Sequence, residues 1–409
     1  MKACLRLLAC SLFFALTLSG CEGLYPPAEK DRQMVLCYFS SHNNSLSEAS
    51  RSVLNDIRSA ALPSADDDSK VLLVYYHLAD TVPVLARMSR DGDGKLVETR
   101  LMTYPGNGTL SVKSLSAEQL KQVWTDAQTL FPSRKHSLFI SSHGSGYLPA
   151  GYLSDPENMV GPMEEDPYRF LVKSDGSTRT IGPDDDLEIN IQDFASAFAG
   201  YHFDVIMFDC CYMGGVEVAY EMKDICDYFV AAPTEVMSKG IICGEMIMPS
   251  FSASADSVAR SVCNIYMNRV KNDPGYCSSG TVSAVKSSEL DELATICSDI
   301  FSRRRSVLGQ IDPKTVQPYF RNRQHWFYDF SDLVRKICTN EDGSQDEAYA
   351  NFRTAMEKAV VYKGTTPKFL EITINTYSGL STYLPDRNCP NLNNYYKTLS
   401  WNKKTGFVM

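Results

Sequence analysis

Two segments of the chain end apolar runs on residues that can do nucleophilic chemistry. Residues 203–215 read FDVIMFDCCYMGG, an apolar run that stops on an aspartate and two adjacent cysteines before a turn. Residues 136–146, HSLFISSHGSG, end a second such run on His143 and glycines. A cysteine thiolate attacks a carbonyl carbon when a neighbouring base or cation lowers its pKa. The pair predicts a cysteine-protease dyad, although each segment taken alone is also typical of structural residues at a strand end.

Spacing and side-chain alternation favour one arrangement of these residues. His143 and Cys211 are 211 − 143 = 68 residues apart, far enough to lie on different strands of one sheet. Neighbouring strand positions face opposite sides, so Cys211 shares a side with Asp209, and Cys210 faces the other way. We expect Cys211 to be exposed and Cys210 to be buried. The glycines after His143 let backbone N–H groups approach a substrate carbonyl without a side chain intervening.

Strand and helix signals alternate along most of the chain. Continuous apolar runs alternating with helices are typical of parallel sheets covered on both faces. The predicted fold class is therefore α/β with a largely parallel central sheet, and ligands bind such sheets outside the carboxyl ends of their strands. The predicted strands are 34–39, 70–78, 136–146, 203–209, 226–232 and 369–377, with a hairpin at 89–104; the predicted helices are 46–62, 116–131, 190–200, 215–225, 254–271 and 287–307.

Composition restricts the classes of function. The chain of 409 residues is 44% hydrophobic and 22% charged, as globular proteins are, and its net charge of −9 argues against nucleic-acid binding. The ten cysteines after Cys21 are scattered without a CxxC pair, which argues against a zinc site and a dithiol oxidoreductase. The turn at 91–94 is not an EF-hand, because Lys95 and Leu96 occupy a ligand position and the glycine position. We expect no metal and no cofactor; calcium at the acidic run 184–186 is the alternative, although a solvated turn explains that run better.

The N-terminus predicts export. Lys2 and Arg6 precede an apolar stretch, and L-S-G-C at 18–21 resembles the bacterial lipobox, in which the cysteine is lipidated and becomes the first mature residue. An ordinary signal cut by another peptidase is the alternative. The stretch is too short for a spanning helix, which needs about 20 apolar residues. We expect a protein of the bacterial cell envelope, on the periplasmic or cell-surface side, held to the membrane only by lipid on Cys21; the segments are a signal peptide (1–20), a tether (21–31) and a body (32–409).

The two motifs together are similar to a known family. SSHGSGYLP (141–149) followed by FDVIMFDCCYMGGVEVAYEM (203–222) closely resembles the clostripain family of cysteine peptidases, whose hallmark is a strand ending in His-Gly and then a stretch of the type fDxIxFDACxMgxxEvAYE. VLCYFSSHNNSL (35–46) and YSGLSTYLP (377–385) extend the likeness, so that matching blocks span about residues 34–401. The family belongs with caspases, legumains and gingipains. The resemblance therefore implies a caspase-like α/β/α sandwich, with residues 32–409 as a caspase-like peptidase domain with a C-terminal extension. It also implies an endopeptidase acting on protein or peptide substrates.

The resemblance also implies a role for each motif residue. Cys211 matches the family's nucleophile, and Cys210 stands where the family has alanine. His143 is implied as the general base or as the group that protonates the leaving amine, and the N–H groups of Gly144 and Cys211 as the oxyanion hole. Asp209 is implied as the carboxylate of a pocket that favours Arg or Lys before the cleaved bond, since a buried carboxylate pairs well with a guanidinium.

Alternatives stay open at two points. Asp209 would instead cap the helix that follows the turn, and the specificity would then lie elsewhere, around Thr234 and Glu235. The rival function is a non-catalytic caspase-like lipoprotein that binds partners. Such proteins usually lose the cysteine or the histidine, and both are present here. We expect a monomer.

The sequence departs from the family between its two motifs. Some members cut themselves at a basic residue shortly after the histidine. This chain has no Lys or Arg from Gly144 to Tyr168, and the first ones are Arg169, Lys173 and Arg179. The departure puts autoprocessing at the usual place in doubt.

Overall fold

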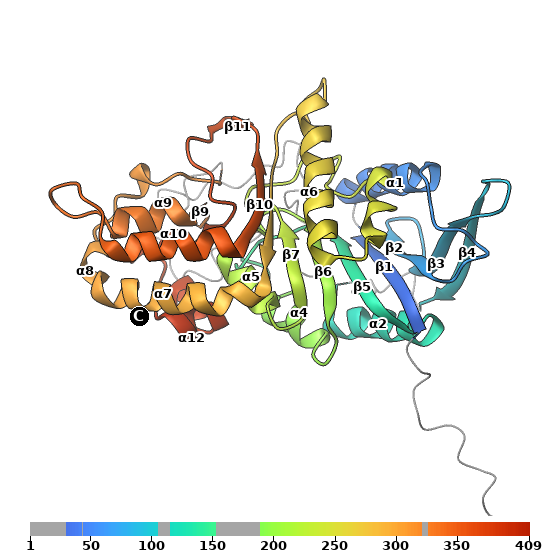
Figure 1. Ribbon diagram of the computed structural model, residues 1–409, viewed down its shortest axis with the longest axis horizontal. Coiled ribbons are helices and arrows are strands. Elements are labelled where there is room, and N and C mark those ends of the chain that lie inside the picture. The colour runs from blue at the N-terminus through green and yellow to red at the C-terminus, as the bar shows by residue number, and fades with distance from the viewer. Residues whose placement is uncertain (1–29, 43, 105–114, 153–188, 321–325) are drawn as a thin grey trace, which may run out of the picture.

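Long apolar runs form the centre of one large sheet. The computed structural model describes residues 30–42, 44–104, 115–152, 189–320 and 326–409. Within these residues the sheet has nine strands in the order β10–β8–β7–β6–β5–β1–β2–β3–β4 (Figure 1). The strands are β1 (Lys30–Ser41), β2 (Lys70–Leu78), β3 (Val84–Arg90), β4 (Leu96–Thr103), β5 (Ser133–Ser141), β6 (Phe203–Asp209), β7 (Cys226–Ala231), β8 (Thr281–Lys286) and β10 (Val360–Thr365).

The strand directions confirm the predicted fold class. β2, β1, β5, β6 and β7 run parallel, and they are the strands whose sequences are continuously apolar. The predicted hairpin forms β3 and β4 at one edge. β8 and β10 run antiparallel at the other edge. A parallel strand is buried on both faces, so a continuous apolar run is expected in the parallel centre of the sheet rather than at its edges.

Helices cover both faces of the sheet (Figure 1). α1 contacts β1 and β2, and α6 contacts β6, β7, β8 and β10 on the same face. α2, α4 and α5 contact one another in series on the opposite face. β2 is added on one side of β1, and β5, β6 and β7 on the other, so right-handed crossovers place the helices of the two directions on opposite faces. The helices are α1 (Asn44–Ser59), α2 (Ala117–Leu130), α4 (Ile191–Ala197), α5 (Val216–Met222), α6 (Ala255–Asn272), α7 (Leu290–Arg303), α8 (Arg305–Leu308), α9 (Phe330–Ile337), α10 (Glu347–Ala359), α11 (Pro390–Tyr396) and α12 (Ser400–Thr405).

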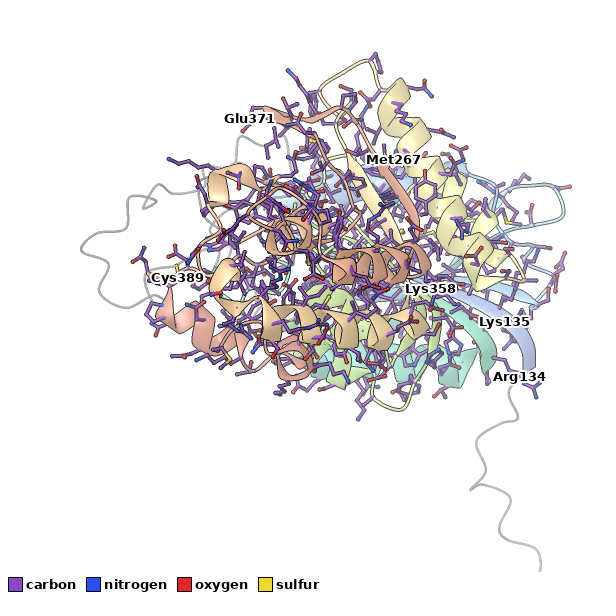
Figure 2. The ribbon with its side chains drawn as sticks, turned by 60° about the vertical axis from the view of Figure 1, so that its left-hand side comes forward. Arg134, Lys135, Met267, Lys358, Glu371 and Cys389 are labelled. Atoms are coloured by element: carbon purple, nitrogen blue, oxygen red, sulfur yellow. The ribbon has the colours of Figure 1, made fainter. Side chains whose placement is uncertain are left out.

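The prediction of a strand at residues 369–377 is wrong. The chain there forms only the short strands β11 (Lys368–Phe369) and β12 (Ile372–Thr373), because it reverses at Leu370, whose φ is +50°. The strand of this region is instead β10, which begins directly after α10 and packs under α6. Met267 of α6 lies so close to Gly364 of β10 that an added Cβ would come within 2.5 Å of its Cγ (Figure 2).

Most of the cysteines in the described residues lie in the core. Nine of the ten in the described residues are buried, and Cys389 is half-buried. No helix in this part of the chain combines the length and the hydropathy of a membrane span.

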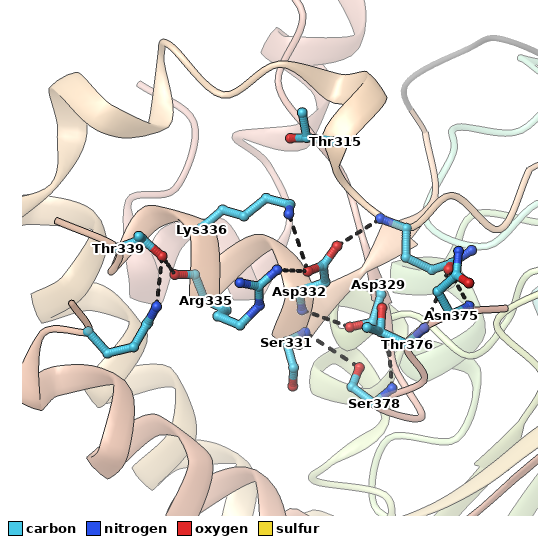
Figure 3. Close-up of polar contacts among 12 residues, drawn as sticks. Thr315, Asp329, Ser331, Asp332, Arg335, Lys336, Thr339, Asn375, Thr376 and Ser378 are labelled. Carbon is cyan, nitrogen blue, oxygen red and sulfur yellow. Dashed lines mark hydrogen bonds and ion pairs between the residues drawn. The ribbon is translucent and has the colours of Figure 1, made fainter. Parts of the chain in front are cut away.

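Buried carboxylates anchor the C-terminal segment near β9 (Tyr328–Asp329). Asp329 accepts hydrogen bonds from the Tyr319 hydroxyl (2.5 Å), from Ser378 N (2.6 Å) and from Asp332 N (2.7 Å). Asp332 in turn pairs with Arg335 at 2.7 Å (Figure 3). Burial raises the pKa of Asp329, and the hydrogen bonds from these donors offset only part of the cost of burying its ionised form. The network fixes the chain at residue 378, just before the segment that reaches the centre of the sheet.

That next segment, which contains β13 (Ser381–Thr382), lies against the turn that follows β6. Ser381 N donates to the carbonyl of Gly214 (2.9 Å). The buried carboxylate of Glu217 accepts from the Thr382 hydroxyl (2.8 Å) and from the Tyr396 hydroxyl (2.6 Å). Burial raises the pKa of Glu217. The C-terminal third of the chain therefore holds the turn that carries the adjacent cysteines.

We predict that Gly214→Ala destabilises the protein by about 1–3 kcal/mol, the usual cost of overpacking. A Cβ at this position would lie 2.4 Å from Pro233 N and 2.6 Å from the Ala232 carbonyl carbon, and backbone atoms cannot rotate away. Urea unfolding followed by circular dichroism measures the change.

Gly92→Ala is the matched control, because a Cβ there meets nothing within 4 Å. It should change the free energy of unfolding by no more than about 0.5 kcal/mol. Equal unfolding curves for the two variants would show that the turn does not pack against the end of β7 as described.

Candidate active site

The ends of β5 and β6 bring the two sequence motifs together. The strands pair in parallel, and Ser141 lies opposite Asp209. His143 and Cys211 therefore follow their strands by the same two residues, at the same edge of the sheet. A Cβ added to Gly144 would lie 2.5 Å from the carbonyl oxygen of Cys211 and 3.1 Å from its nitrogen. The backbone after the histidine is thus in direct contact with the backbone at the cysteine, and only glycine fits there.

The two cysteines face opposite sides, as strand alternation predicts. Cys210 Sγ lies 3.6 Å from the carbonyl oxygen of Ile140 on β5. Cys211 Sγ accepts a hydrogen bond from Val236 N at 3.2 Å. Asp209 shares the side of Cys211, because its Oδ1 accepts from Ile241 N at 2.6 Å, in the same stretch of chain as Val236.

The expectation that Cys211 is exposed is wrong. Its side chain has 0% of its surface exposed, because residues 234–242, which we call the covering segment, fold back over the end of β6 after β7. Two backbone hydrogen bonds hold residues 232–234 against the turn after β6: Tyr212 N donates to Thr234 O (2.9 Å), and Gly214 N donates to Ala232 O (2.8 Å). In the described conformation the sulfur lies beneath the covering segment.

The structure gives no support to the cap alternative for Asp209. α5 begins at Val216, and its N-cap is Gly215, six residues after the aspartate. The carboxylate is fully buried, and its Oδ1 accepts from Ile241 N instead. Asp209 therefore lies in a protein-lined position beside the cysteine rather than on the helix.

Thr234 and Glu235 begin the covering segment and are buried. The Thr234 hydroxyl lies 2.7 Å from the hydroxyl of Thr281 on β8 and 2.9 Å from the carbonyl oxygen of Glu235. Glu235 is 1% exposed and directly precedes Val236. The structure thus places the side chain of Thr234 against β8, and Glu235 is a second buried acidic residue, next in the chain to the amide that contacts the sulfur.

Sequence reasoning missed three groups at this site. Two are the backbone amides of Val236 and Ile241, which carry no side-chain signal. The third is Arg269 of α6, which donates to the carbonyl oxygens of Ile241 (3.1 Å) and Ile242 (3.4 Å) and also to that of Gly240. In the sequence it is one of two basic residues in the last turn of a helix, a common position that indicates no function.

Several expectations fall on residues that the structure does not describe. They are the signal peptide, Cys21 and most of the tether, the basic residues Arg169, Lys173 and Arg179, and the acidic run 184–186. Within the described ranges, no group of three or more His, Cys, Asp or Glu side chains is arranged to hold a metal ion.

Comparison with solved structures finds the same fold in cysteine proteases. The chain is 30% identical to an inactive zymogen C11 protease from Parabacteroides distasonis, with a TM-score of 0.73 over 93% of this chain and 99% of that one. It is 25% identical to a secreted C11 cysteine protease from Bacteroides thetaiotaomicron solved with an irreversible peptide inhibitor, with a TM-score of 0.71 over 91% and 98% of the two chains. A search of curated proteins finds no match.

The sequence model of the clostripain family matches residues 168–407, which is more than half of the chain. The chain belongs to the clostripain family. It is a cysteine-type peptidase, as the family and the structural relatives show. The residues matched by the family model include Cys211. His143 lies before them, so its place in the site is supported by the pairing of β5 with β6 and not by the family model.

We predict that Cys211→Ala abolishes hydrolysis of peptide reporters and that Cys210→Ala keeps most of it. Cys211 Sγ lies on the side of Asp209 and the covering segment, whereas Cys210 Sγ faces β5. Release of a fluorophore from peptides that carry Arg, Lys, Ala or Asp before the scissile bond measures the activity. Loss of activity in Cys210→Ala, with activity kept in Cys211→Ala, would reverse the assignment.

Proposed function

We propose that the protein is an exported, lipid-anchored endopeptidase that cleaves after Arg or Lys with a Cys211–His143 dyad. The observation that supports the dyad best is the backbone contact between Gly144 and Cys211, which brings the residue after His143 onto the cysteine. A histidine and a cysteine held by two paired strands meet the geometric need of a thiolate nucleophile and its base.

The proposed reaction is acyl transfer through a thioester. The Cys211 thiolate attacks the carbonyl carbon of the scissile bond, with its proton passed to His143. The N–H groups of Gly144 and Cys211 donate to the oxyanion of the tetrahedral intermediate. The C–N bond then breaks as His143 protonates the leaving amine. Water, deprotonated by the same imidazole, hydrolyses the thioester and restores the thiol.

The part of the covering segment around Val236 must move before this reaction starts, whereas residues 239–242 stay fixed to α6. Cys211 has no exposed surface, and the amide of Val236 occupies the space beside its sulfur. Attack requires the carbonyl carbon of the substrate at about 3–3.5 Å from the sulfur. We propose that the described conformation is a closed one. The solved relative from Parabacteroides distasonis, an inactive zymogen, is an example of an inactive state on the same fold.

Asp209 is the proposed recognition group for a basic side chain. It is buried on the nucleophile side, and one carboxylate oxygen already accepts from Ile241 N. A carboxylate in such a position is costly to desolvate, and a guanidinium or ammonium group of the substrate offsets that cost more than a neutral side chain does.

The proposed location is the bacterial cell envelope, with the lipobox-like cysteine as the site of acylation. The support is the sequence L-S-G-C at residues 18–21 after a short apolar stretch. The substrates are proteins or peptides, the enzyme acts as a monomer, and lipid is its only contact with the membrane.

Asp209→Asn should lower kcat/KM for Arg and Lys substrates by about 2–4 kcal/mol of transition-state stabilisation, the scale for breaking a desolvated charge pair. It should cost a neutral substrate much less, because no charge pair is lost. Steady-state kinetics on matched Arg and Ala peptides measures both effects.

Asp227→Asn is the matched control. Asp227 lies on neighbouring β7, is more than half exposed and pairs with His202 at 2.9 Å. A variant of Asp209 that keeps its preference for Arg would place the specificity elsewhere, with Glu235 as the next candidate.

Cys21→Ser should release the protein from membranes or block its maturation, since a serine at the lipobox position is not acylated. Metabolic labelling with a fatty-acid analogue and membrane fractionation measure this, with Cys10→Ser in the apolar stretch as the control. Continued acylation of the Cys21 variant would contradict the lipoprotein assignment.

A further inference from the structure

The guanidinium of Arg269 on α6 is hydrogen-bonded to the backbone of the covering segment. Arg269 donates to three consecutive carbonyl oxygens, those of Gly240, Ile241 and Ile242. Its guanidinium carbon lies 5.9 Å from the ring centroid of Tyr266, one helical turn earlier on α6. A planar guanidinium with several donors can satisfy consecutive carbonyls in this way, and the aromatic ring fixes its plane. The three carbonyls cannot shift without losing a charged donor.

A second ion pair fastens the same segment to the same helix. Lys239 pairs with Asp273, the C-cap residue of α6. The Asp273 carboxylate also accepts from Gly275 N (2.8 Å), and the two donors lower its pKa, the hydrogen bond from Lys239 most. The position of residues 239–242 is therefore set by α6.

The peptide group between Gly240 and Ile241 lies between two charged side chains. Its carbonyl oxygen accepts from Arg269, and its N–H donates to the carboxylate of Asp209 at 2.6 Å. The dipole of the amide thus points its positive end at the carboxylate and its negative end at the guanidinium. Hydrogen bonds in such a chain polarise and strengthen one another. The position of the Asp209 carboxylate is coupled to Arg269 through this one amide.

We propose that Arg269 is a positioning residue for substrate specificity, which holds Asp209 through the Gly240–Ile241 peptide group. The inference rests on the proposed role of Asp209 and deepens it. Arg269 acts on the carboxylate rather than on the substrate or the sulfur. Without it, three carbonyls lose a charged donor, the Ile241 amide moves, and the carboxylate loses the hydrogen bond that orients it toward a basic side chain.

The test is the kinetics of Arg269→Gln with matched Arg and Ala peptides. We expect KM for the Arg peptide to rise roughly tenfold or more, the effect of one lost charge-assisted hydrogen bond, with kcat within about threefold. The kcat/KM for the Ala peptide should change by less than about threefold. Arg269→Lys keeps the charge but not the planar fork, so it should fall between the variant and the wild type.

Arg260→Gln is the matched control on the same helix. Arg260 pairs with Asp256 (2.8 Å) and with a carbonyl of β10, away from the covering segment, so its loss should leave the preference for Arg unchanged. The double variant Asp209→Asn with Arg269→Gln should be no worse on the Arg peptide than Asp209→Asn alone, because Arg269 acts through Asp209. Additive losses, or an Arg269→Gln variant that behaves like Arg260→Gln, would overturn the proposal.

Hydrogen exchange separates this inference from the proposed function. Both Asp209→Asn and Arg269→Gln should speed exchange of the Ile241 amide, read from peptides that cover residues 236–243. If Asp209→Asn keeps the preference for Arg, the proposed specificity and the role of Arg269 in it both fail. Faster exchange in both variants would then leave only the structural coupling standing, whereas unchanged exchange in Arg269→Gln would remove the coupling as well.

Discussion

The candidate site depends first on the parallel pairing of β5 with β6. With Ser141 opposite Asp209, His143 and Cys211 leave the sheet at the same level, and Gly144 lies on the cysteine backbone. A slip of the register by one residue would turn every side chain of β6 to the other face, and Cys210 would then occupy the place of Cys211. Both faces of the two strands are buried, so such a slip would expose core side chains to solvent or make them clash.

The C-terminal third of the clostripain fold supports this centre without supplying its dyad. Glu217 joins the turn after β6 to Thr382 and Tyr396, and Asp329 holds the chain at Ser378 before it reaches that turn. Both carboxyl groups are buried and have a raised pKa. Removing a donor from either one leaves a polar group without compensation in the core, which costs more than the hydrogen bond itself is worth. The motif residues of the C-terminal segment are thus explained as supports of the nucleophile turn.

Sequence patterns predicted the strands and helices that depend on interactions between residues close in the chain. Continuous apolar runs marked the parallel strands, and the segment predicted as a helix at 116–131 forms α2, whose N-cap Ser116 accepts a hydrogen bond from the backbone N–H of Gln119. β8 (TVSAVK) and β10 (VVYKGT) were missed because small and polar residues interrupt their apolar positions. Residues 369–377 misled because the chain reverses at Leu370 instead of continuing as one strand. The burial of Cys211 was mispredicted for another reason. It depends on where a distant backbone returns, and the amides of the covering segment leave no trace in the sequence.

The burial of Cys211 also affects how readily its thiol is oxidised. Peroxide converts an accessible thiolate to sulfenic acid and then, irreversibly, to sulfinic acid. A sulfur with no exposed surface, capped by the amide of Val236, meets oxidants only while the covering segment is open. In the closed conformation that we propose, chemical damage to the thiol is therefore limited by the fraction of time that the residues around Val236 spend open.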